Sequence, residues 1–183
     1  MTSDTLTEKF GAAIAPTYTN PGEVKAKPKS LHKLDITSSS LLKAYLKTAS
    51  DGLGITKVNH GCLLILWLLD ENGEIWFALE EAFKEAPGEN LHHPMSRFWP
   101  FDPNSNFLKL GHPSLLDRPQ KARIGGEIIY DPEFGSHGWV ISNKSGRYGS
   151  RAKDQPEKHL TEAASVWNAF GISFDIYYIR AVS

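Results

Sequence analysis

The chain has 183 residues, with 20 Lys and Arg against 21 Asp and Glu, which gives a formal net charge of −1. This length fits one domain, and the near-zero charge gives no overall electrostatic reason to bind nucleic acid or an anionic membrane. The single Cys excludes an intramolecular disulfide framework and zinc sites of the CxxC type. The longest apolar run is too short to span a bilayer as a helix, and no signal-peptide pattern opens the sequence, so we expect a cytoplasmic location.

Residues 1–30 mix Pro, Thr and Lys without hydrophobic periodicity. They predict a flexible or draped N-terminal tail, followed by a single domain over residues 31–183. The first helix of that domain is expected from Ser39 or Ser40 to Ala49, because the serines suit an N-cap and the apolar residues that follow share one face.

A β-hairpin is expected next, because a continuous apolar run over residues 62–69 is followed by a polar turn and a second apolar segment, 74–77. Residues 78–86 have helical spacing, which would leave Glu80, Glu81 and Glu85 on a solvated face. The prolines between residues 87 and 122 oppose long regular elements, so this span predicts a long ordered loop with at most one short helix.

A second hairpin should pair residues 126–130 with 138–142. A helix then begins at Asp154 or Gln155 and ends at Gly171, because its apolar residues form a single stripe. Alternating apolar residues over 172–182 predict a C-terminal strand. Together these elements predict an α+β fold: one domain with a mainly antiparallel sheet of hairpins and two or three helices.

The sequence lacks the GxSxG, HExxH, GxxxxGK[ST] and GxGxxG motifs, which removes the common serine-hydrolase, zinc-protease and P-loop classes but not every enzyme. We therefore expect no cofactor. His92 and His93 are adjacent and cannot both point to one side of a strand or helix, so they make a poor chelate and we expect no metal site.

The segment after the second hairpin is rich in basic residues and glycine, as anion-binding loops often are. Its predicted ligand-binding residues are Asn143, Ser145, Gly146, Arg147 and Tyr148. Arg147 could form paired hydrogen bonds with a phosphate or carboxylate, and Tyr148 could stack on a ring. The alternative is an ordinary basic turn, in which Gly146 would hold a positive φ and its replacement by Ala would cost stability.

His112 and Glu127 form the predicted catalytic pair. His112 lies in a loop before the strand that carries Glu127, and the two side chains could face each other across a cleft for general acid–base work. The alternative is a capping or surface His and an unrelated Glu on the face of a strand.

Aromatic residues at Phe98, Trp99 and Phe101 predict an exposed patch that would bind a partner protein. The alternative is that these side chains belong to the core.

Three short motifs carry a resemblance to a known group of domains. They are His112-Pro113-Ser114-Leu115, then Gly125-Gly126-Glu127-Ile128, then Ser142-Asn143 with Ser145-Gly146-Arg147-Tyr148. This pattern resembles small bacterial domains found as C-terminal modules of polymorphic toxins and secreted effectors, which typically carry HP[ST]L, AGE[IV] and SNxSGHY. The similarity covers about forty of the 183 residues, and the preceding Trp67–Gly73 hairpin also fits it. Arg147 stands where the family has His, and Gly125 where it has Ala.

The resemblance implies a bacterial toxin or effector-type domain, delivered into a target cell, with an anion- or nucleotide-binding site that could serve group transfer. The alternative is an immunity or adaptor protein without catalytic activity, which would bind a toxin, an immunity protein or a host target. The residues leave open whether the protein is an enzyme.

Overall fold

The computed structural model describes residues 3–51, 62–97, 101–102, 104–117, 120–149 and 155–181. Its α-helices are α1 (Ser3–Phe10), α2 (Pro21–Lys25), α3 (Ile36–Asp51) and α4 (Glu157–Ala169). Its strands are β1 (His32–Lys33), β2 (Ile65–Asp70), β3 (Ile75–Leu79), β4 (Glu81–Lys84), β5 (Leu91–Pro94), β6 (Leu108–Leu110), β7 (Ala122–Tyr130), β8 (Trp139–Ser142) and β9 (Asp175–Tyr177). A short 3₁₀ helix, η2 (His112–Leu115), precedes β7.

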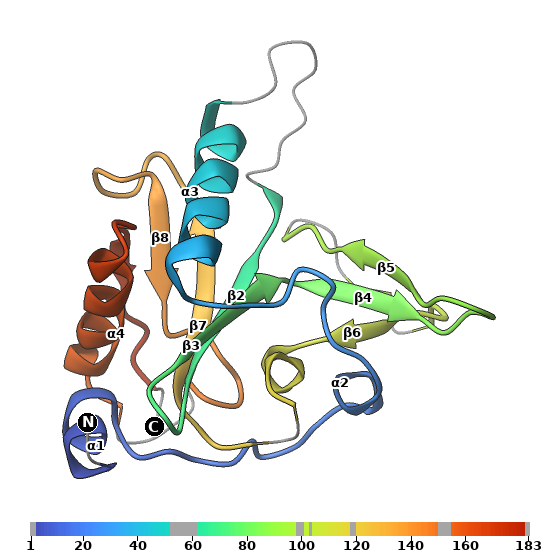
Figure 1. The fold of residues 1–183 in the computed structure, drawn as a ribbon, viewed down its shortest axis with the longest axis horizontal. Helices are drawn as coiled ribbons and strands as arrows, with labels where there is room; N and C mark the ends of the chain where they lie inside the picture. The colour runs from blue at the N-terminus through green and yellow to red at the C-terminus, as the bar shows by residue number, and fades with distance from the viewer. Residues whose placement is uncertain are drawn as a thin grey trace.

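The strands form two sheets, which confirms the predicted α+β class (Figure 1). The larger sheet has the order β1-β3-β2-β7-β8-β9 and is antiparallel except between β8 and β9. The smaller sheet has the order β5-β4-β6 and extends to one side of the larger one. Both predicted hairpins, β2–β3 and β7–β8, are present.

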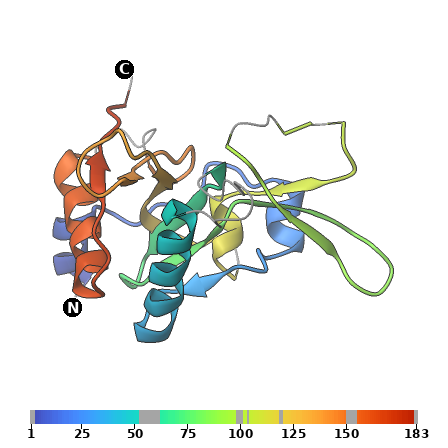
Figure 2. The same cartoon turned by 90° about the horizontal axis from the view of Figure 1, so that it is seen from above.

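The central strand β2 is covered on both faces, and its alternate side chains enter two different cores. Ile65, Trp67 and Leu69 pack beneath α1, α3 and α4, which lie together over one face of the sheet (Figures 1 and 2). Leu66 and Leu68 point to the opposite face, which is covered by η2 and by the loop over residues 143–149. We call this second side the η2 face.

Helix α3 begins at Ile36, three residues before the predicted start. Asp35 and Ser38 explain the difference, because each side chain bonds the backbone N–H of the other at 2.7–2.8 Å. This reciprocal cap moves the start of the helix upstream of the serines that the sequence suggested. Helix α4 carries the predicted apolar stripe, in which Leu160, Ala163 and Trp167 are fully buried.

The predicted helix over residues 78–86 is wrong. β3 continues to Leu79, and β4 follows at Glu81 and pairs with both β5 and β6. The span 87–122, predicted as a loop, likewise contains β5, β6 and η2. The apolar spacing of Leu79 and Phe83 fits a helix as well as a strand. Pairing with strands elsewhere in the chain therefore determines the structure of both segments.

The N-terminal tail is draped over the domain, but it contributes more to the core than its composition predicted. Leu6 and Phe10 of α1 are buried with α4, and the backbone of Ile14 pairs with that of Ala122. We call residues 3–30 the arm. In Figure 1 the arm runs from α1 beneath the larger sheet to α2 and then returns to α3.

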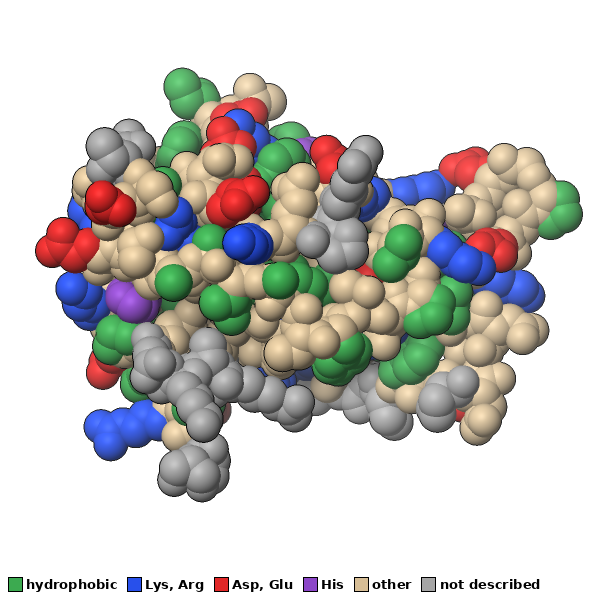
Figure 3. All heavy atoms as spheres, turned by 90° about the horizontal axis from the view of Figure 1, so that it is seen from below, with side chains coloured by type: hydrophobic (Ala, Val, Ile, Leu, Met, Phe, Trp, Pro, Cys, Tyr) green, Lys and Arg blue, Asp and Glu red, His purple; other side chains and the backbone are tan. Residues whose placement is uncertain are grey.

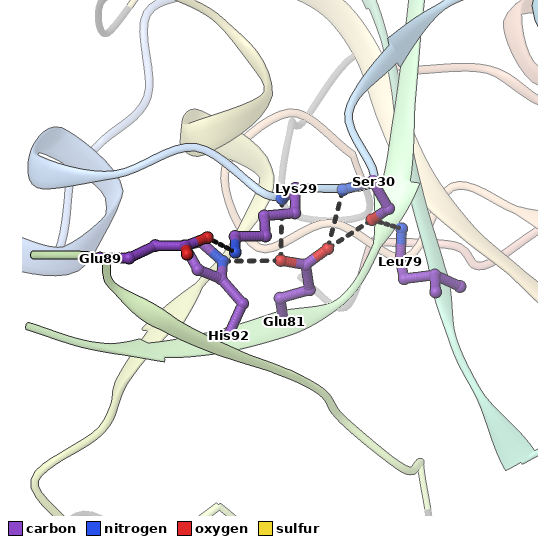
Figure 4. Close-up of polar contacts among 6 residues, drawn as sticks. All are labelled: Lys29, Ser30, Leu79, Glu81, Glu89 and His92. Atoms are coloured by element: carbon purple, nitrogen blue, oxygen red, sulfur yellow. Dashed lines mark hydrogen bonds and ion pairs between the residues drawn. The ribbon is translucent and has the colours of Figure 1, made fainter. Parts of the chain in front are cut away.

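The end of the arm is attached to the smaller sheet through Glu81, which was predicted to be solvated (Figure 4). The Glu81 carboxylate accepts the backbone N–H groups of Lys29 and Ser30 at 2.9 and 3.0 Å, and Nδ1 of His92 lies 2.9 Å away. Burial alone would raise the pKa of Glu81, yet these hydrogen bonds and one from the Ser30 hydroxyl hold it below its usual value.

Glu81→Gln should lower the free energy of unfolding by about 2–4 kcal/mol at neutral pH, because an amide cannot accept all of these bonds and leaves buried donors unpaired. The folded pKa of Glu81 is lowered, so its contribution is present above pH 4.5 and is lost as the pH falls below that value. Urea denaturation at several pH values measures both effects. Glu89→Gln is the matched control, since Glu89 pairs with Lys29 on the exposed surface, and it should unfold as the wild type does.

Candidate functional site

The predicted site residues His112, Glu127 and 143–148 all lie on or beside the η2 face. Gly125 and Glu127 of β7 point to this side, because Glu127 lies opposite Leu66 in the register with β2. The residue before η2, Gly111, lies next to the Arg147 guanidinium. The fold therefore brings together the three motifs on which the resemblance depends.

His112 is buried in η2 and is bonded to the backbone of β7. Its Nε2 lies 2.9 Å from the carbonyl oxygen of Gly126, and a carbonyl can only accept, so Nε2 carries the proton. Burial and the nearby Arg147 charge lower the pKa of His112 to about 4, against the opposing effect of the bond to Gly126. His112 is thus a neutral donor at physiological pH. No hydrogen bond joins His112 to Glu127 among the described residues, and its Nε2 bonds the backbone of β7 instead.

His112 should make stability depend on pH between 6.5 and 4. As the pH falls, the unfolded chain binds a proton at His112 before the folded chain does. The contribution of neutral His112 to the free energy of unfolding is therefore complete above about pH 6.5, and it falls by about 3 kcal/mol as the pH approaches 4. His112→Gln keeps an N–H donor without the titration and should flatten this part of the curve of unfolding free energy against pH. His159, whose pKa burial also lowers, acts in the same direction, and His159→Gln measures its share.

Glu127 belongs to a cluster of two acidic and two basic side chains, which we call the charged cluster: Glu80, Lys109, Glu127 and Lys144. Lys144 Nζ lies 3.0 Å from Glu127 Oε2, and Lys109 Nζ lies 2.7 Å from Glu80 Oε1. The carboxylates have 12–15% of their side-chain surface exposed, whereas the lysines have 40–62%. Each nearly buried carboxylate therefore has a partner that reaches solvent.

Burial raises the pKa of Glu127, and the neighbouring Glu80 charge acts in the same direction, while Lys144 opposes both. A carboxyl group of this kind is suited to proton transfer nearer neutral pH. Sequence reasoning missed Glu80 and Lys109. Assignment of Leu108–Leu110 to a strand could have identified Lys109, because side chains alternate along a strand and Lys109 would point to the side opposite its two leucine neighbours.

The loop over residues 143–149 satisfies most of its own polar groups. The Asn143 amide bonds both backbone groups of Ile179, at 2.8 and 3.0 Å. Ser145 Oγ accepts the backbone N–H groups of Arg147 and Tyr148. These two side chains were predicted to bind a ligand, but here they fix the loop to the C-terminal segment and to itself.

Tyr148 was predicted to stack on a ligand ring, and the structure corrects this. Its side chain is fully buried in the core of the η2 face, and its hydroxyl donates to the Gln120 carbonyl at 3.0 Å. Its own carbonyl accepts the Gly125 N–H at 3.0 Å. Tyr148 therefore joins the loop to β7 and leaves no ring face for a ligand.

Gly146 was expected to need a positive φ if this loop were only a turn, but Gly146 has no positive φ and a Cβ there would meet nothing within 4 Å. Gly149 is the glycine that the packing requires. A Cβ at Gly149 would overlap the Asn143 carbonyl oxygen, because the loop closes tightly on itself.

Gly149→Ala should therefore destabilise the protein by about 1–3 kcal/mol or prevent folding, as other substitutions that overfill a packed interior do. Gly146→Ala should stay within about 0.5 kcal/mol of the wild type, because it adds a methyl group to open space. Equal losses from the two variants, measured by urea denaturation, would contradict this assignment.

Arg147 already has an anionic partner within the chain. Its Nη2 lies 3.1 and 3.2 Å from the two carboxylate oxygens of Glu23 in α2, and its guanidinium carbon lies 4.2 Å from the ring centroid of Tyr18. Both partners belong to the arm. Arg147, which was predicted to bind an anion, thus binds a carboxylate of the protein itself.

The predicted partner-binding patch is described in part. Phe98 and Trp99 lie outside the described residues, whereas Phe101 is partly buried and lines a surface pocket beside the smaller sheet. Met95 and Phe107 line the same pocket. Figure 3 shows that acidic, basic and apolar side chains are interspersed on the face of the molecule that is seen from below the view of Figure 1.

Among the described residues, no three His, Cys, Asp or Glu side chains are placed to hold a metal ion. In the same part of the chain, every helix is too short or too polar to cross a membrane. No protein-family model, curated protein sequence or solved structure matches this chain.

Proposed function

We propose that this chain is a bacterial toxin or effector-type domain that transfers a group to or from an anionic substrate, such as a nucleotide, at the charged cluster. The observation that carries the proposal is the nearly buried Glu127 carboxylate, whose pKa burial raises and which lies 3.0 Å from the solvent-exposed Lys144. Glu127 belongs to the GGEI motif, which the fold brings to the same face as the HPSL and SNKSGRY motifs, and this supports the toxin-type assignment.

In this proposal Glu127 moves the proton, because its raised pKa populates both the acid and the carboxylate nearer neutral pH. Lys144 and Lys109 would bind the anionic group of the substrate, since their ammonium groups reach solvent beside the two carboxylates. His112 and the loop over residues 143–149 are positioning groups. They fix β7, which carries Glu127, and the loop that carries Lys144.

Growth of bacteria that express the protein tests the proposal. The wild type should arrest growth, and Glu127→Gln should relieve the arrest, because loss of a general acid or base typically costs about 10²–10⁴-fold in rate. Glu74→Gln is the matched control: Glu74 pairs with Lys33 at a distant exposed site and is expected to leave toxicity unchanged. Both variants must melt as the wild type does. Arrest by Glu127→Gln equal to that by the wild type would sink the catalytic assignment.

The second candidate is an immunity or adaptor protein that acts by binding. The pocket lined by Phe101, Met95 and Phe107 favours it, because an apolar surface of this kind suits a protein partner. Normal growth of cells that express the wild type would support this function. A complex with the product of a neighbouring gene should then survive Glu127→Gln and weaken with Phe101→Ala.

A further inference from the structure

We propose that Arg147 is the cationic wall of a second anion-binding site, which takes a phosphate or carboxylate group and which Glu23 of the arm occupies in the closed protein. Residues 15–28 then act as a strap that an external oxyanion displaces. This site uses Arg147 in the anion-binding role that the sequence predicts. It does not depend on the chemistry proposed for Glu127.

The Glu23–Arg147 contact has the burial of a ligand-binding site rather than of a surface ion pair. The Glu23 side chain is fully buried, and 11% of the Arg147 side chain is exposed. Gly111 forms the floor of the site, because a Cβ there would overlap Glu23 Oε1 and lie 3.1 Å from Arg147 Nη1. The absence of a side chain at Gly111 leaves the space that the carboxylate fills.

Glu23 does not use the full capacity of the guanidinium. Both carboxylate oxygens lie near Nη2, whereas Arg147 Nε is buried without a hydrogen-bond partner. Glu23 Oε1 is also buried and lies 3.1 Å from Nη2, and the backbone N–H of Gly111 acts on the same carboxylate. A guanidinium binds a phosphate or carboxylate best through two parallel N–H donors. A free oxyanion that reached both Nε and an Nη would therefore satisfy Arg147 better than the tethered Glu23 does.

Electrostatics also make Glu23 a replaceable occupant. Burial raises the pKa of Glu23, although the Asn20 N–H and Arg147 both act to lower it, and Lys109 contributes in the same direction as Arg147. Opening the strap without a replacement would break the ion pair with Glu23 and the contact with Tyr18, and would leave the Arg147 guanidinium with water alone. Exchange of one anion for another keeps an ionic partner on Arg147, so an oxyanion favours the open strap.

The strap has an anchor at each end and one short packed helix between them. At one end the backbones of Ile14 and Ala122 form a pair of hydrogen bonds at 2.9 and 3.0 Å, and at the other Glu81 holds Lys29 and Ser30. Between these anchors lies the five-residue helix α2, which packs on β6 and η2 with Gly22 against Leu108, and the exposed ion pair of Lys25 with Glu85. Exposed pairs of this kind contribute little. Displacement of the strap from Arg147 would break the packing of α2 on β6 and η2, whereas the contacts of Glu81 at the C-terminal anchor (Figure 4) need not change.

Hydrogen exchange on the full wild-type chain tests the proposal, with sodium phosphate, sodium acetate and sodium chloride compared at one ionic strength. Phosphate or acetate should speed amide exchange in residues 15–28 and slow it in residues 145–149, while α1 stays unchanged. A response to both phosphate and acetate would show that the site binds oxyanions in general. A response to only one of them would show that the site selects that anion. Unchanged exchange in the strap, or slower exchange in both segments, would overturn the proposal.

Two variants give an independent measurement. Glu23→Ala removes the internal occupant and should lower the phosphate concentration at half-saturation by about tenfold or more, as expected when a competing contact worth about 1.4 kcal/mol is lost. Glu85→Ala is the matched control, because it removes an exposed contact of the same strap and should leave phosphate binding as in the wild type. Arg147→Gln should abolish the exchange response. A response that survives Arg147→Gln would place the anion elsewhere and overturn the assignment even if Glu23→Ala fails to fold.

Discussion

The antiparallel pairing of β2 with β7 is the constraint on which the other features of this protein depend. In its register Leu66 lies opposite Glu127 and Ile65 opposite Ile128. A shift of one residue would move Glu127 into the helix-covered core and Ile128 onto the η2 face. Because both faces of β2 are buried, such a shift would bury a carboxylate without a partner. The pairing therefore fixes at once the core and the place where the charged cluster can form.

Polar groups are buried in this fold mainly where backbone groups can satisfy them. His112 donates to the Gly126 carbonyl, Asn143 bonds both backbone groups of Ile179, and Glu81 accepts two backbone N–H groups. Each bond connects segments distant in the sequence, and each supplies the partner that a buried polar group requires. The Glu23–Arg147 pair differs, because part of its hydrogen-bonding capacity stays unused.

The sequence predicted elements well where periodicity and turn residues agreed. The hairpins β2–β3 and β7–β8 and the apolar stripe of α4 follow directly from such patterns. The strands β4 and β6 could not be predicted in the same way, because they are short and their pairing with each other joins residues far apart in the sequence. Local propensity carries little information about pairings of this kind.

Candidate residues were predicted less well than elements, because residue type alone does not reveal a partner. The sequence placed His112, Glu127 and Arg147 in one region, and the fold brings them to one face. It could not show that Tyr148 is a core residue or that Glu23, 124 positions before Arg147, would meet its guanidinium. Those contacts depend on how the arm crosses the sheet, which the composition of residues 1–30 does not reveal.

The packing of α1 against α4 has a consequence for how the chain acquires its structure during synthesis. Leu6 and Phe10 leave the ribosome long before Leu160 and Trp167, which complete the same core. The ribosome adds about 5–20 residues per second, so these early apolar side chains wait many seconds for their partners. Throughout that interval the nascent arm has neither α4 nor Arg147 to dock on. During that interval its apolar side chains are therefore open to chaperones and proteases.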